Sequence, residues 1–174
     1  LDTDLICWKP LAPRLAGLDA AAVHREDITP AIYPGPAAFT RTDGFDLAAW
    51  DWTARPFNTA LAYFGDDDFR RYYTNTAIRF MRCSPDADDT LTYMVFAEQR
   101  LLAMCAAQQN ARIAALSDLP ALFSGAQDGY FTHTWGFKQQ LRENDALQAD
   151  FCRRCAARLR RDFPQEAAYL AQVP

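Results

Sequence analysis

The sequence predicts an α/β fold in which a mixed sheet is flanked by helices. Apolar runs of strand length, such as residues 56–64, alternate along the chain with helical segments, such as residues 66–81. Strands that alternate with helices are typical of α/β proteins. No internal repeat or linker divides the sequence, so we expect one domain over residues 1–174, with core motifs in 1–140 and carboxyl-terminal helices in 141–174.

The first 52 residues are predicted to be mostly loop, with two short strands and a brief helix. Residues 5–8 form an apolar run that ends at Lys9, which is typical of a strand that passes into a turn. Residues 11–45 are rich in proline and poor in periodic apolar runs, so we expect loop there, with one short strand near 31–35. Residues 46–52 favour a brief helix.

The rest of the chain is predicted to alternate strands and helices. Residues 56–64 favour a buried strand because they are largely apolar. Asp66, Asp67 and Asp68 precede apolar residues at helical spacing and predict the start of a helix, because carboxylates stabilise the positive end of the helix dipole. The later segments are a buried helix at 90–109, a strand at 111–116, a loop at 117–129, a strand into a turn at 130–138, an amphipathic helix at 139–161 and a closing helix from Pro164.

Composition excludes several functional classes. The chain has 174 residues, is 50% hydrophobic and carries a net charge of -4, so it can bury a core and has no basic field for nucleic acid. No segment reaches the roughly 18 apolar residues of a membrane span. Five scattered cysteines favour a reducing compartment, and we expect a cytoplasmic protein. Cys152 and Cys155 have half the pattern of a zinc or redox site but no second pair nearby, so we interpret them as incidental.

Two aspartates one residue apart, Asp2 and Asp4, precede the first apolar run. At the carboxyl end of a strand the chain turns, and both carboxylates can then reach one divalent cation and a phosphate bound to it. Open α/β sheets bind ligands at that end. An acidic turn without a ligand is the alternative, and the two residues alone are compatible with both.

One of the two histidines and one of the two lysines lie close together, as His133 and Lys138. The imidazole of His133 can bind a metal ion, and the ammonium group of Lys138 can bind a phosphate. Gly136 between them permits a tight backbone turn. The alternative is a histidine packed in a strand and hydrogen-bonded to the backbone.

Three polar residues lie in otherwise apolar segments. Asn58 stands near the start of the strand predicted at 56–64, where a buried amide is costly unless it forms a hydrogen bond. Glu98 and Gln99 interrupt the apolar helix, so at least one of them must face a cleft or find a partner. A capping asparagine and an exposed helix edge are the alternative.

In this order, four stretches resemble the second half of a GT-A glycosyltransferase. The nearest likeness is to the retaining family that includes glycogenin and the bacterial lipopolysaccharide galactosyltransferases, and to a related group of bacterial proteins. The stretches are LDTDLICWKPL, similar to the Asp-x-Asp motif, FNTALAYF, similar to F-N-x-G, EQRLLA, similar to D-Q-x-x-L-N, and HTWGFK, similar to H-x-x-G-x-x-K-P-W. The resemblance covers residues 1 to about 140.

The resemblance implies roles for eight residues. They are Asp2, Asp4 and His133 as metal ligands, Lys138 as a diphosphate contact after the turn at Gly136, and Asn58, Glu98 and Gln99 as catalytic contacts at the reacting sugar or acceptor. The chain departs from the family at three positions. Ala60 replaces a glycine, Glu98 replaces an aspartate, and Lys138 comes one residue early without Pro-Trp after it.

The function implied by this resemblance is transfer of a sugar from a nucleotide-diphosphate donor to a glycan or other hydroxyl acceptor, in polysaccharide biosynthesis. The resemblance implies Mn²⁺ or Mg²⁺ as the cofactor and retention of the anomeric configuration. Inversion with a carboxylate base stays open, as do the donor base, the sugar and the acceptor.

GT-A folds form their nucleotide-binding strands before the Asp-x-Asp motif, with which this sequence begins. We therefore expect the chain alone to bind nucleotide poorly and to be inactive. We also expect an exposed sheet edge, which favours oligomers.

Two other functions are alternatives to glycosyl transfer. LDTDLI also resembles the first motif of aspartyl-phosphate phosphatases, with Asp2 as nucleophile and Asp4 as acid, and residues 65–69 resemble their acidic last motif. That mechanism needs a lysine between the two motifs, and none occurs between Lys9 and Lys138. The second alternative is a glycan-binding relative that has lost catalysis.

Overall fold

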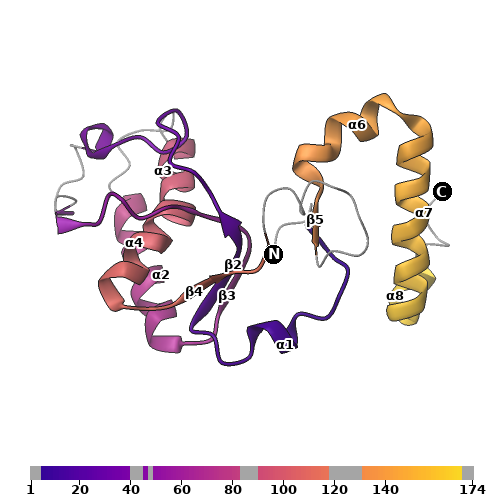
Figure 1. Cartoon of the computed structure of the whole chain (residues 1–174), viewed down its shortest axis with the longest axis horizontal. Helices are drawn as coiled ribbons and strands as arrows, with labels where there is room; N and C mark the ends of the chain where they lie inside the picture. Colours follow the sequence, from indigo (N-terminus) through magenta and orange to yellow (C-terminus); the bar gives the residue numbers. More distant parts are fainter. Residues whose placement is uncertain (1–4, 40–44, 47–48, 83–89, 118–130, 170–174) are drawn as a thin grey trace. The chain divides into compact units, whose positions relative to one another are not determined.

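The computed structural model describes residues 5–39, 45–46, 49–82, 90–117 and 131–169. It divides into two compact units, Leu1–His133 (unit 1) and Thr134–Pro174 (unit 2). Every strand of the described chain lies in unit 1, where helices also pack, while unit 2 is helical (Figure 1). The α/β class is confirmed, and the single-domain organisation stays a prediction.

A three-stranded mixed sheet is the centre of unit 1 (Figure 1). Its middle strand, β2 (Ala20–Arg25), pairs antiparallel with β3 (Phe57–Phe64) and parallel with β4 (Ile113–Ala115). The strands predicted at 56–64 and 111–116 are thus confirmed.

Strand β2 was not predicted, because its sequence begins with three alanines, which have low strand propensity. Its first four residues are completely or almost completely buried between the two neighbouring strands, so tertiary packing determines its conformation. The prediction of a short strand near 31–35 was wrong. The chain there makes a turn, in which the amides of Ile32 and Tyr33 donate to the carbonyl of Thr29.

A second, antiparallel pair joins the two ends of unit 1. Strand β1 (Leu5–Cys7) runs against β5 (Phe131–His133), with Leu5 opposite His133. The indole Nε1 of Trp8 donates to Oγ1 of Thr132 at 2.7 Å. Both strands contribute to an apolar cluster with the three-stranded sheet: Leu5, Ala21, Val23, Ala60, Leu61, Leu116 and Phe131. The predicted strand at 5–8 and the strand into a turn predicted at 130–138 are confirmed.

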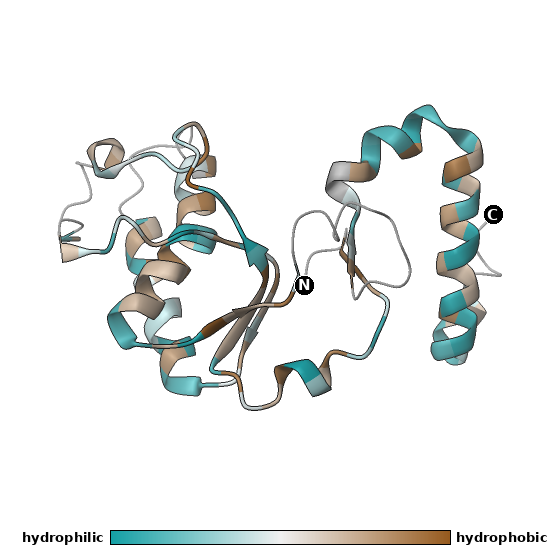
Figure 2. Ribbon diagram, in the orientation of Figure 1, coloured by the Kyte–Doolittle hydropathy of each residue, from teal (hydrophilic) through white to brown (hydrophobic). Residues whose placement is uncertain are grey.

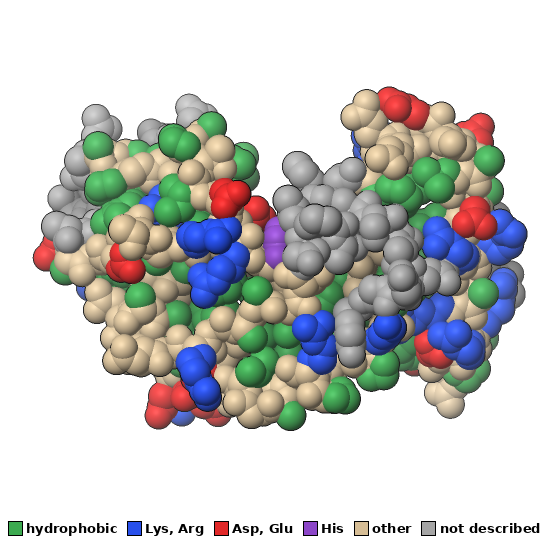
Figure 3. Space-filling view, in the orientation of Figure 1, with side chains coloured by type: hydrophobic (Ala, Val, Ile, Leu, Met, Phe, Trp, Pro, Cys, Tyr) green, Lys and Arg blue, Asp and Glu red, His purple; other side chains and the backbone are tan. Residues whose placement is uncertain are grey.

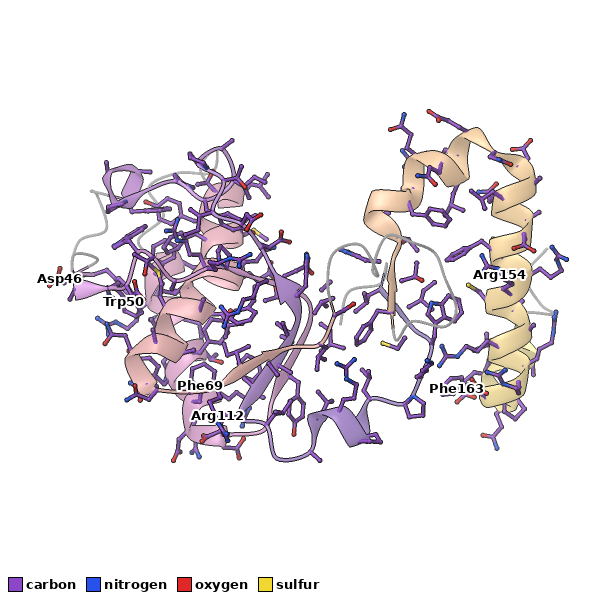
Figure 4. The ribbon with its side chains drawn as sticks, in the orientation of Figure 1. Asp46, Trp50, Phe69, Arg112, Arg154 and Phe163 are labelled. Atoms are coloured by element: carbon purple, nitrogen blue, oxygen red, sulfur yellow. The ribbon has the colours of Figure 1, made fainter. Side chains whose placement is uncertain are left out.

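Helix α2 (Asp67–Arg82) confirms the predicted helix, and Asp66 caps it. One oxygen of Asp66, Oδ1, accepts from the amides of Asp68 at 2.8 Å and Phe69 at 2.9 Å. Arg112 lies at the same end of unit 1 as Phe69 (Figure 4) and pairs with Asp19 at 3.5 Å.

The helix predicted at 90–109 is present but consists of three segments. They are α3 (Thr90–Val95), the π-helical turn η3 (Phe96–Arg100) and α4 (Leu101–Gln109). A π-turn adds one residue to the helix and commonly marks a functional position. The helices pack through a cluster that includes Phe39, Phe80, Tyr93, Phe96, Leu101 and Met104.

Two other predictions fall partly or mostly outside the described residues. The brief helix expected at 46–52 falls partly outside the described residues, and its last residues, Asp51 and Trp52, lie in a turn closed by Ala54. Most of the loop expected at 117–129 also lies outside the described residues.

Unit 2 contains η4 (Thr134–Phe137), α6 (Lys138–Glu143), α7 (Asp145–Asp162) and α8 (Pro164–Ala167). The single helix predicted at 139–161 was wrong, because Asn144 has an extended backbone and interrupts it. Its side chain accepts from the amide of Leu147 at 3.0 Å and caps α7. Hydrophilic and hydrophobic residues alternate along α7 (Figure 2), and its Phe151 packs on Phe137 with ring centroids 5.5 Å apart.

Two leucines on the segmented helix test the core of unit 1. Leu101 is fully buried and Leu91 is 71% exposed. Replacing Leu101 by alanine should lower the free energy of unfolding by about 2–5 kcal/mol, because it opens a cavity. The matched Leu91→Ala change should cost less than about 0.5 kcal/mol. Urea unfolding followed by circular dichroism measures both, and equal losses would contradict the packing described.

Candidate functional site

The β1–β5 pair brings two of the predicted motifs together. His133 lies opposite Leu5, which directly follows Asp4 in the sequence. The His133 side chain is 7% exposed. Asp2 and Asp4 themselves lie outside the described residues.

No group of three or more His, Cys, Asp and Glu side chains that could hold a metal ion occurs among the described residues. The predicted ligands Asp2 and Asp4 are not among the described residues. Of the three predicted metal ligands, only His133 is therefore described.

The two predicted phosphate-binding residues lie in unit 2. Gly136 is within the turn η4, and Lys138 is the exposed first residue of α6. The ammonium is thus five residues along the chain from His133, after one turn of 3₁₀ helix. Its role stays a prediction.

Asn58 lies near the start of β3 and takes part in a polar cluster with β2. Its Nδ2 donates to Oε1 of Glu26 at 3.0 Å, and its Oδ1 accepts from the amide of Ala60 at 3.1 Å. The same Glu26 oxygen lies 3.4 Å from Nε2 of His24, which is 2% exposed. His24 and Asn58 are register partners across the two strands, and the pairing shifts there between Ala22 and His24. This irregularity places three polar side chains together at one end of the sheet.

Gln99 lies in the π-turn η3 and is also fixed by hydrogen bonding. Its Oε1 accepts from the hydroxyl of Tyr33. The next residue, Arg100, is buried and donates from Nη1 to the carbonyl of Tyr33 at 3.2 Å. Its Nη2 donates to the backbone carbonyl of Trp52, and its guanidinium carbon lies 5.1 Å from the centre of the Trp52 ring. Two adjacent residues of the π-turn therefore hold one tyrosine by its hydroxyl and its carbonyl.

The group formed by His24, Glu26 and Asn58 interacts electrostatically with the group formed by Tyr33, Gln99 and Arg100. Burial raises the pKa of Tyr33, and the negative charge of Glu26 raises it further, while Arg100 lowers it. Tyr33 therefore stays protonated and keeps donating to Gln99. We call His24, Glu26, Tyr33, Asn58, Gln99 and Arg100 the polar cluster.

Charged residues adjoin Glu26, since Arg25 and Asp27 precede and follow it and Arg55 Nε donates to its backbone carbonyl at 3.3 Å. Arg25 lies 4.2 Å from the centre of the Phe57 ring, and burial together with nearby Arg55 lowers its pKa. Arg55 pairs with Asp27 at 2.8 Å. Figure 3 shows blue and red side chains close together on the face of the molecule that is in view.

Glu98 differs from its neighbour Gln99, because its side chain is exposed. Its backbone carbonyl accepts from the hydroxyl of Tyr73 at 3.3 Å, as does that of Ala97 at 3.1 Å. These contacts stabilise the π-turn. Asn58 and Gln99 are thus both held by hydrogen bonds, Asn58 to Glu26 and Gln99 to Tyr33.

Four members of the polar cluster were missed by sequence reasoning: His24, Glu26, Tyr33 and Arg100. One signal was available, since His24 is one of only two histidines and follows an apolar run. The acidic motif at 65–69 has a structural role, because Asp66 caps α2 while Asp67 and Asp68 pair with Arg70 and Arg71.

No protein family, curated protein or solved structure matches the chain. No helix of the described residues is long and apolar enough to cross a membrane.

An Asn58→Asp substitution tests the polar cluster. It places a second carboxylate about where Asn58 now donates to Glu26, so we expect the free energy of unfolding to fall by about 1–3 kcal/mol at pH 7. Near pH 4 one of the carboxyls takes a proton, and the loss relative to the wild type should shrink. Urea unfolding at both pH values measures this.

Asn75→Asp is the matched control, because Asn75 is exposed on α2. It should change stability by less than about 0.5 kcal/mol at either pH. A loss for Asn58→Asp that is the same at pH 4 and pH 7 would show that charge repulsion with Glu26 is not its cause.

Proposed function

We propose that this chain carries metal-binding and acceptor-binding residues of a glycosyltransferase that uses a nucleotide-diphosphate sugar. The observation that carries the proposal is the β1–β5 register, in which Leu5, the residue after Asp4, lies opposite His133. The Asp-x-Asp and histidine motifs are far apart in the sequence, and metal binding by both requires their proximity.

The residues suit a divalent cation of the Mn²⁺ or Mg²⁺ type. Carboxylate oxygens are good ligands for both ions, and an imidazole nitrogen favours Mn²⁺ of the two. Asp2, Asp4 and His133 would hold the ion. When bound, it would stabilise the negative charge that develops on the leaving diphosphate.

The protein side chains have separate tasks in this proposal. The ammonium of Lys138 would bind the diphosphate as a compact positive charge. Asn58 and Gln99 would orient the sugar, since the hydrogen bonds to Glu26 and Tyr33 fix their amide groups before a ligand arrives. Attack by an acceptor hydroxyl on the same face as the leaving group would retain the anomeric configuration.

We propose the cytoplasm as the location. Cys105, Cys152 and Cys155 are thiols rather than disulfides in the structure, which suits a reducing compartment.

Isothermal titration calorimetry of the full-length gene product with UDP tests the proposal. We expect binding with Mn²⁺ that is lost with a chelator. His133→Ala and Asp4→Asn should each weaken this metal-linked binding at least tenfold, because each removes a ligand. Asp68→Asn is the control, since that carboxylate is 95% exposed on α2 and should not affect binding.

GDP and the other nucleotide diphosphates are titrated in the same way. If none of them gives metal-linked heat, the glycosyltransferase proposal fails. Equal binding by the wild type and His133→Ala would remove His133 from the metal site.

A further inference from the structure

Glu26 is the partly exposed end of a buried hydrogen-bonded group. Its side chain is 27% exposed, whereas His24 beside it is 2% exposed. Nδ2 of Asn58 donates to Oε1 of Glu26, and Nε2 of His24 lies 3.4 Å from the same oxygen. The carboxylate is thus held from the protein side through one of its two oxygens.

The second oxygen, Oε2, is the available acceptor. A carboxylate offers about four lone-pair sites. Within the described chain, the hydrogen-bond and ion-pair contacts of the Glu26 side chain all involve Oε1. A partly exposed carboxylate fixed by neighbours is a preorganised acceptor, because it loses little side-chain freedom when a donor binds.

A donor group lies directly beside this carboxylate. Asn58 uses one N–H for Glu26 and retains a second. Each sugar hydroxyl both donates and accepts a hydrogen bond, so a carboxylate oxygen beside amide N–H groups is suited to neighbouring hydroxyls of a saccharide.

We propose that Glu26 is a saccharide-binding residue, whose Oε2 accepts a hydrogen bond from a sugar hydroxyl beside the amide of Asn58. This inference rests on the proposed function and deepens it, since it adds a residue that the motifs do not include. The hydroxyl belongs either to the acceptor glycan or to the sugar of the donor. Both present the same chemistry to the carboxylate.

Titration of the full-length gene product with maltose, lactose and cellobiose, without nucleotide or metal, tests the acceptor. Binding is measured by ligand-observed NMR for the wild type, Glu26→Gln and Asp27→Asn. We expect Glu26→Gln to weaken saccharide binding about tenfold. The amide NH₂ of glutamine replaces the accepting Oε2, and the charge-assisted hydrogen bond is lost. The glutamine carbonyl still accepts from Asn58, so the fold should persist, which circular dichroism checks.

Asp27→Asn is a stringent control. Asp27 is the next residue, but its side chain is 92% exposed and pairs with Arg55. It should leave saccharide binding unchanged. An equal loss in both variants would overturn the proposal, because it would show a general effect of negative charge.

A second arm tests the donor sugar. UDP, UDP-glucose and UDP-galactose are titrated with Mn²⁺ present, and the gain in affinity from the sugar is compared between the wild type and Glu26→Gln. Loss of this gain supports Glu26 as a donor contact, and weaker binding of the free disaccharides supports it as an acceptor contact. No effect in either arm, including the absence of any wild-type saccharide binding, overturns the inference.

The two proposals fail in different ways. If metal-linked UDP binding is present and Glu26→Gln changes no sugar-dependent affinity, only the inference about Glu26 fails. If no nucleotide binds but disaccharide binding depends on Glu26, the transferase proposal fails and the saccharide site stands.

Discussion

Pairing between β1 and β5 is the constraint on which the account depends. It joins the first and last described segments of unit 1, and Leu5 and Phe131 bury their side chains in the core that also packs the three-stranded sheet. The Trp8–Thr132 hydrogen bond fixes the same register. A shift of one residue would turn every side chain of β1 to the other face of the pair, so burial of Leu5 and Phe131 also determines which face His133 occupies.

The polar cluster depends on two local departures from regular structure. The register shift in β2 brings His24 and Glu26 together with Asn58, and the π-turn presents Gln99 and Arg100 to Tyr33. Irregular backbone of both kinds is common near functional sites. Buried polar groups are costly unless they are hydrogen-bonded, and here each amide acceptor is already paired within the protein. Such a cluster is rigid before a ligand arrives.

The sequence predicted the parts of the fold that local patterns determine. Strand β3 and helix α2 follow from an apolar run and from helical spacing after three aspartates. Strand β2 did not, because its alanines have low strand propensity and only burial between β3 and β4 makes them a strand. The break at Asn144 depends on one capping side chain inside a continuous amphipathic pattern. In the candidate site, Asn58 and Gln99 were predicted, but Glu26 was not, since its partner Asn58 is 32 residues away and an acidic residue after a strand resembles a solvated loop.

Coordination of the metal by His133 is the most direct test of the central claim. Electron spin echo envelope modulation of the full-length gene product with Mn²⁺ and UDP detects a nitrogen bound to the metal. The account predicts nitrogen modulation typical of a histidine ligand in the wild type, and its loss in His133→Ala while the β1–β5 pair stays folded. Bound Mn²⁺ without nitrogen modulation, or modulation that persists in His133→Ala, would contradict the account.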